Sequence, residues 1–86
     1  AGVGIKPWPW AGAVRVTEHH AASGRTRLHV FDRWCHLGSV AEEAAAVALA
    51  ARAPRAFDVD VWRMVGRWLA VPAHLQQVAP LPAGEA

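Results

Sequence analysis

Apolar and polar side chains alternate along the first third of the chain. From Gly12 to Glu18 every second residue falls on one face, which is the period of a half-buried strand. Small and turn-forming residues at 21–25 predict a hairpin loop, and residues 26–31 predict the returning antiparallel strand. A short third strand is predicted over 34–37, ended by Gly38.

The hydrophobic spacing changes to a helical period after Gly38. Residues 39–42 (SVAE) match a capping box, in which a Ser hydroxyl and a Glu carboxylate cap the first turn. The predicted helix runs to about Arg52, and Pro54 ends it because proline cannot continue the hydrogen-bond ladder. Its predicted apolar stripe consists of small side chains: Val40, Ala44, Val47 and Ala51.

A second amphipathic helix is predicted to begin at Asp58. Four residues at helical spacing form its inward face: Val61, Val65, Trp68 and Leu69. Weak alternation from His74 to Val78 predicts an extra C-terminal edge strand, and residues 80–86 predict a disordered tail. The fold class is therefore α+β: a two- or three-stranded antiparallel sheet, as a hairpin or a meander, packed by two helices.

Length and composition limit the organisation to one domain. The 86 residues are 53% hydrophobic and 19% charged, which supports a core and indicates a single small domain over 1–86. Residues 1–10 form an extended entry rich in Trp and Pro. The chain begins without an initiator Met, so we expect it to be a fragment of a longer protein.

Charge and cysteine content limit the cellular location and the binding partners that we expect for this chain. The formal net charge is +2 and the pI is near 9.5, which permits a nucleic-acid partner without requiring one. The single cysteine, Cys35, cannot form an internal disulfide, so we expect a reducing, cytoplasmic location. The sequence contains neither a run of about 20 apolar residues nor a signal-peptide pattern. We therefore expect no membrane partner.

The sequence offers weak signals for metal binding or catalysis. Four candidate zinc ligands are present: His19, His20, Cys35 and His36. Adjacent residues on a strand point to opposite faces, and no C-x-x-C or H-x3-H pair occurs. Cys35 near Asp32 has the atoms of a nucleophilic site but no feature of an activated thiol. We therefore expect no metal, no cofactor and no catalytic residue in this segment.

Aromatic and basic residues form the remaining candidate site. Five residues make the predicted DNA-binding set: Trp8, Trp10, Arg15, Arg25 and Arg27. Exposed aromatic rings beside cations hold single-stranded nucleic acid by base stacking and phosphate contact. In the alternative interpretation, both tryptophans fold back and cover the sheet, as a domain of this size needs.

Ordered blocks of residues resemble a known family. They are WPWAGAV at 8–14, LHV at 28–30 with Trp34, LGSV at 37–40, EE at 42–43, and AFDxDxWR at 56–63. The series resembles the C-terminal region of Cho-type UvrC-homologue endonucleases. It is also similar to bacterial proteins that fuse a DNA polymerase III epsilon-like exonuclease to a GIY-YIG module. The resemblance spans about Ile5 to Ala70 and contains no catalytic signature.

The resemblance implies a parent that cuts DNA during repair or processing, with a divalent metal in upstream nuclease domains. No catalytic residue can be assigned to a position in this chain. The leading hypothesis is a non-catalytic accessory domain that contacts DNA. The alternative is a docking or dimerisation module that binds the upstream domains of the same chain.

Overall fold

Four antiparallel strands form one sheet in the computed structural model, which describes residues 7–82. The strands are β1 (Val14–His20), β2 (Arg25–Asp32), β3 (Cys35–Val40) and β4 (Val78–Pro80), in the spatial order β3-β2-β1-β4. The predicted meander is therefore confirmed. The C-terminal edge strand is also present, although it begins at Val78 and not at His74.

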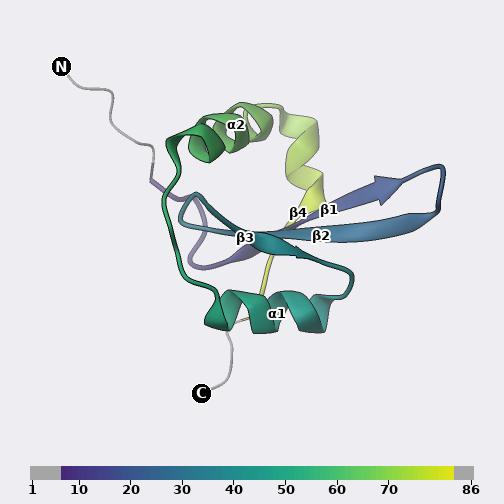
Figure 1. The fold of residues 1–86 in the computed structure, drawn as a ribbon. Helices are drawn as coiled ribbons and strands as arrows, with labels where there is room; N and C mark the ends of the chain where they lie inside the picture. The colour runs from purple at the N-terminus through teal and green to yellow at the C-terminus, as the bar shows by residue number, and fades with distance from the viewer. Residues whose placement is uncertain (1–6, 83–86) are drawn as a thin grey trace.

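Helices lie on opposite faces of this sheet. Figure 1 shows α1 (Glu43–Arg52) below the sheet and α2 (Val59–Leu69) above it. A 3₁₀ helix, η1 (Pro72–Gln77), connects α2 to β4, so residues 74–77 are helical and not extended. The α+β class with two helices packed on an antiparallel sheet is confirmed. No helix within residues 7–82 is long and apolar enough to cross a membrane.

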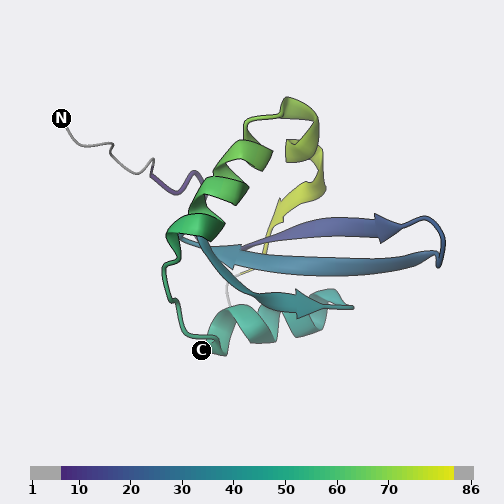
Figure 2. The same ribbon diagram turned by 45° about the horizontal axis from the view of Figure 1, so that its top comes forward.

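The β1–β2 hairpin is the longest element of the sheet. Its register runs from Val14 opposite Phe31 to His20 opposite Arg25. Gly24 adopts a positive φ of 70°, and its amide donates to the His20 carbonyl at 2.8 Å, which closes the predicted turn. The tip of this hairpin extends past both helices, as Figures 1 and 2 show.

The first residues of the predicted capping box belong to strand β3. The strand continues through Ser39 and Val40, which pair with His29 and Leu28 of β2. The cap of α1 is instead Glu42, which makes no side-chain cap hydrogen bond. The prediction of a helix from Ser39 is wrong because two ladder positions in the sheet satisfy more backbone groups than one local cap does.

The core on the α1 side contains Leu28, Val30 and Ala46 as its buried members. Leu49 and Ala50 of α1 pack against them. The predicted stripe is wrong: Val40 lies in β3, and Ala44 and Ala51 are exposed. Alanine occurs on nearly every side of α1, so hydrophobic periodicity could not distinguish its buried face.

Helix α2 begins where the sequence predicts. The Asp58 carboxylate accepts hydrogen bonds from the Asp60 amide at 2.8 Å and the Val61 amide at 3.4 Å. Val65 is its buried residue, and Trp68 and Leu69 beside it are half-buried. The predicted inward face of this helix therefore points to the sheet.

The C-terminal residues of the described range are built into the sheet. The Leu81 amide donates to the Ala13 carbonyl at 2.9 Å, and the Leu81 side chain packs against the core. Pro80 pairs with Val14. Of the predicted tail over 80–86, residues 83–86 lie outside the described residues, as do residues 1–6 of the predicted entry.

Candidate nucleic-acid interface

The two predicted tryptophans at the entry pack against the domain. The Trp8 ring meets the buried Trp34 edge-on at 5.0 Å between centroids, and Trp10 contacts Trp8 in the same way at 4.9 Å. The Trp8 indole Nε1 donates to the Gly12 carbonyl at 2.8 Å. Both rings are half-buried. This geometry corresponds to the alternative interpretation, in which the tryptophans cover the end of the sheet.

Arg15 is bound to helix α1. Its Nε lies 2.7 Å from a Glu43 carboxylate oxygen, and its Nη1 donates to the Thr17 hydroxyl at 2.8 Å. Alternation along β1 places Arg15 on the α1 face, because it pairs with the buried Val30. Its cation is thus partly neutralised and faces away from α2.

Arg25 and Arg27 lie together on the opposite face. Arg27 sits opposite Glu18, on the same face as His29 and Phe31 further along β2. Its Nη1 donates to the Ser39 hydroxyl at 3.3 Å. Within residues 7–82, neither Arg25 nor Arg27 forms an ion pair with a carboxylate. Both guanidinium groups remain available to an anion.

The five predicted residues therefore do not share one surface. Arg25 begins β2 and Asp32 ends it beside the turn that carries Trp34, so roughly 24 Å of strand separate Arg25 from the tryptophan cluster. The structure brings Arg25 and Arg27 together, brings Trp8 and Trp10 together, and leaves Arg15 on the other face.

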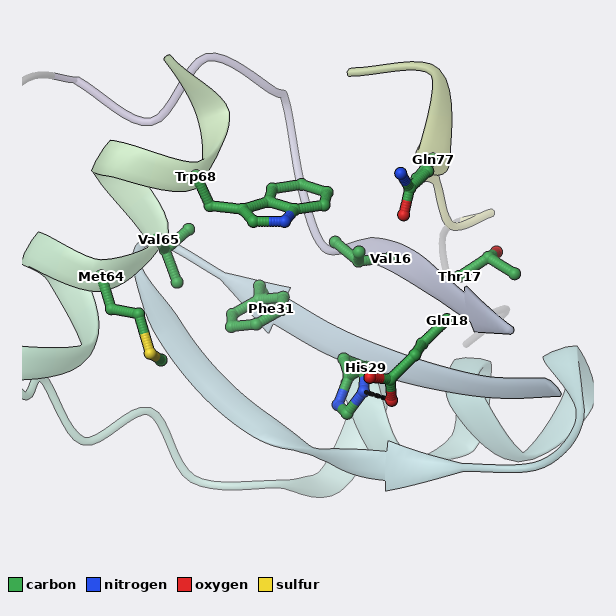
Figure 3. Close-up of a pocket in the computed structure, with 9 residues that line it drawn as sticks. All are labelled: Val16, Thr17, Glu18, His29, Phe31, Met64, Val65, Trp68 and Gln77. Atoms are coloured by element: carbon green, nitrogen blue, oxygen red, sulfur yellow. Dashed lines mark hydrogen bonds and ion pairs between the residues drawn. The ribbon is translucent and has the colours of Figure 1, made fainter. Parts of the chain in front are cut away.

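A groove opens between α2 and the sheet (Figure 3), on the face of β2 that also carries the arginine pair. It has a volume of about 290 Å³. Its apolar lining comes from two strands and one helix: Val16, Phe31, Met64, Val65 and Trp68. The residues of this groove were not predicted as a site from the sequence. The period-two series Arg25, Arg27, His29 and Phe31 on β2 was the available signal, because it places basic and aromatic side chains on one face.

Polar side chains border the open end of the groove. The Glu18 carboxylate accepts a hydrogen bond from His29 Nε2 at 2.9 Å and lies 3.3 Å from His20 Nε2. The His29 hydrogen bond is the main reason that the pKa of Glu18 lies below its ordinary value. Glu18 is therefore an ionised acceptor at neutral pH. Gln77 reaches the groove from η1, as Figure 3 shows.

The pKa of the neighbouring His36 lies below its ordinary value. Its ring lies 5.0 Å from the Phe31 ring and 5.9 Å from the His29 ring. Partial burial lowers the pKa of His36, and the positive charge of His29 lowers it further.

Trp68 is fixed by a contact on its far side. The His74 ring stacks on it at 4.4 Å with an interplanar angle of 12°. His74 Nδ1 donates to the Trp68 carbonyl at 2.7 Å, which identifies Nδ1 as the protonated nitrogen. His74 does not line the groove, so the indole is held from one side and presented to the groove from the other.

The candidate metal and nucleophile residues are dispersed. Cys35 is buried, and its thiol donates to the Arg33 carbonyl at 3.6 Å. His19 contacts the Thr26 hydroxyl at 3.0 Å. Over residues 7–82, no group of three or more His, Cys, Asp or Glu side chains is placed to hold a metal ion.

Comparison with known proteins identifies relatives for most of the chain. The family model described as the excinuclease Cho C-terminal domain matches residues 13–85. Excinuclease cho of Escherichia coli O6:H1 strain CFT073 is 38% identical over 58 residues, which are 67% of this chain and 19% of that protein. The proteins of the same name from Shigella flexneri and E. coli K12 are 36% identical over 58 residues. The match thus spans about a fifth of these relatives. No solved structure matches the chain.

Proposed function

Because the chain belongs to the excinuclease Cho C-terminal domain family, we propose that it is a non-catalytic accessory domain of a DNA-cutting nuclease and that its hairpin contacts DNA. The observation that carries this proposal is the pair Arg25 and Arg27, two cations on one face of a protruding strand with no carboxylate partner in residues 7–82. Arginine is well suited to phosphate because its planar guanidinium donates two parallel hydrogen bonds.

The remaining members of the predicted set take supporting roles in this proposal. Trp8 and Trp10 cover the turn around Trp34, and Arg15 links β1 to α1 through Glu43. Substituting them would change DNA affinity through the stability of the domain and not through a direct contact.

Cleavage itself is assigned to other domains of the longer nuclease. We propose a GIY-YIG module with a divalent metal as the cutting unit, and a DNA polymerase III epsilon-like exonuclease as a further fused domain in some relatives. The protein would then act in the cytoplasm on DNA. The match to about a fifth of each relative leaves room for such domains in those proteins.

DNA contact is tested by removing the two hairpin cations. The double variant Arg25→Ala/Arg27→Ala should bind duplex DNA more weakly, and its salt dependence should fall by about two units of slope if each arginine contacts one phosphate. The measurement is fluorescence anisotropy of a labelled duplex at several salt concentrations.

The matched control is Arg33→Ala/Arg52→Ala, which removes the same charge from two exposed positions away from the tip of the β1–β2 hairpin. Equal losses of affinity in the two double variants would show a general charge effect and contradict the proposed contact. No DNA binding by the unmodified chain at low salt would remove the proposal altogether.

A docking role is the second candidate function. Large apolar side chains are exposed on the segment from the α1–α2 connection to η1: Phe57, Val59, Met64, Val71 and Leu75. Such a concentration is typical of a surface that another protein covers. The variant Phe57→Ser/Leu75→Ser should abolish self-association or binding to the upstream domains of a Cho-family protein, measured by light scattering and pull-down. A monomer that ignores those domains would contradict this candidate.

A further inference from the structure

We propose that the groove between α2 and the sheet binds a single unpaired base of a DNA strand, turned out of the base stack. The inference rests on the proposed DNA contact and adds a specific ligand to it. The groove lies on the same face of β2 as Arg25 and Arg27, so a strand whose phosphates meet these arginines passes beside the groove.

The apolar lining suits a flat aromatic ligand. Trp68 and Phe31 approach the groove from the helix and from the sheet, and Figure 3 shows the Trp68 indole positioned over the strand that carries Phe31. Stacking on aromatic side chains is the principal way in which proteins hold unpaired bases. The His74 ring already fixes the Trp68 ring, so little side-chain freedom is lost when a base binds.

The polar border can read the edge of the base. Within residues 7–82 the Gln77 amide makes no hydrogen bond, so its donor and acceptor are both unused. Glu18 is an ionised acceptor elsewhere on the border of the groove, where it meets His29 (Figure 3), and a carboxylate accepts from an exocyclic amino group. These groups favour bases that carry an exocyclic amino group, such as adenine, over thymine, which has none.

The charge pattern favours DNA over an apolar peptide as the occupant. His29 and Arg27 are two positions apart on one face of β2, about 7 Å along the strand. His29 also donates a hydrogen bond to Glu18 at 2.9 Å. The groove therefore shares its face of β2 with the two arginines, and a phosphate backbone would enter from their end.

The test compares two duplexes that differ by one unpaired base. One duplex carries a single bulged 2-aminopurine and the other is fully paired. The chain should bind the bulged duplex at least about fivefold more tightly, the low end of what one stacked base contributes, and 2-aminopurine fluorescence should be quenched. Bulged adenine should also bind more tightly than bulged thymine.

Two variants locate the effect. Trp68→Leu should reduce the preference for the bulged duplex to below twofold, because it removes the ring on which the base stacks. Gln77→Ala changes an exposed side chain and leaves the fold intact, and it should reduce the preference for adenine over thymine. Arg25→Ala/Arg27→Ala should weaken binding to both duplexes equally.

The outcomes separate this inference from the proposed function. Salt-dependent binding that is equal for the two duplexes overturns the base-binding groove and leaves the DNA contact in place. Binding to neither duplex overturns both. If Trp68→Leu weakens binding of upstream nuclease domains and leaves the bulge preference unchanged, the groove is a protein-docking site and the inference is wrong.

Discussion

The Asp32 carboxylate forms an ion pair with Arg55 beneath the sheet. Asp32 Oδ2 accepts from Arg55 Nη2 at 2.9 Å and from Nε at 3.2 Å, while Asp32 Oδ1 is buried without a hydrogen-bond partner among the described residues. The same guanidinium donates to the Ala50 and Ala53 carbonyls at 2.6 Å each. One side chain thus joins the C-terminal end of α1 to the end of β2.

Arg55→Leu should destabilise the fold because it leaves a buried carboxylate without its counter-ion. We expect a loss of about 2–4 kcal/mol, toward the lower end for buried pairs because Arg55 is about one-third exposed. Urea denaturation monitored by Trp fluorescence measures this value. Asp32→Asn/Arg55→Leu should recover part of the loss, and a double variant as unstable as the sum of the single variants would show that the pair is not coupled.

Gly38→Ala should also destabilise the domain. Gly38 has a φ of 150°, and an added Cβ would lie 2.9 Å from Leu49 Cδ2, where α1 crosses β3. The expected loss is about 1–3 kcal/mol. Gly66→Ala in α2 is the control, because its Cβ meets no atom within 4 Å and alanine favours the helix by about 1 kcal/mol. A Gly38 variant as stable as the Gly66 variant would contradict the close approach.

The turn between β2 and β3 should respond differently at its two positions. Arg33 and Trp34 both have positive φ, 49° and 66°, as in a type I′ turn. Arg33 is exposed, so Arg33→Asn should raise the midpoint of thermal unfolding slightly, since asparagine tolerates this conformation. Trp34 is buried against Trp8, so Trp34→Asn should cost about 3–5 kcal/mol despite the same backbone advantage. Equal changes in stability for Arg33→Asn and Trp34→Asn would contradict the prediction that only the second position is buried in the packing.

Stability should decrease as the pH falls through about 6.5. The pKa of His36 in the folded state lies below its ordinary value of 6.5, because burial and the positive His29 disfavour the charged imidazole. The unfolded chain therefore binds more protons in this range, and the loss levels off below the folded-state pKa. His36→Gln should flatten the curve of urea midpoint against pH in this window.

Glu18→Gln provides the contrast, since it acts in a more acidic window. The folded-state pKa of Glu18 lies below 4.5, so its contribution is complete above pH 4.5 and is lost as the pH falls further. If His36→Gln leaves the slope near pH 6.5 unchanged, the assignment of that slope to His36 is wrong.

Local signals in the sequence predicted most elements of the fold. Hydrophobic alternation predicted the β1–β2 hairpin, and a side-chain cap predicted the start of α2 at Asp58. The helix start predicted from the capping box at Ser39 was wrong because the backbone of Ser39 and Val40 pairs with β2 instead. The prediction of the buried side of α1 was wrong because a helix rich in alanine has little hydrophobic periodicity.

The candidate site was harder to predict because it depends on strand register. Arg15 and Arg27 both occupy polar positions in strands whose apolar and polar residues alternate, so the sequence pattern does not distinguish them. Only the pairing across the hairpin shows that they lie on opposite faces of the sheet. Phe31 and Trp68 are 37 positions apart and line one groove only because α2 packs over the sheet in the folded domain. Such contacts are not encoded in any short segment.

The pairing of β4 with β1 has a consequence for the order of folding. Val16 pairs with Val78, about sixty residues away, whereas β1, β2 and β3 pair through short turns. Closing a long loop costs more entropy, so the three-stranded meander should form first and β4 should add last. Amide exchange should then be faster in β4 than in β2. Gln77 directly precedes β4, so the wall that Gln77 gives the groove would exist only after this final step, and the groove would be completed last.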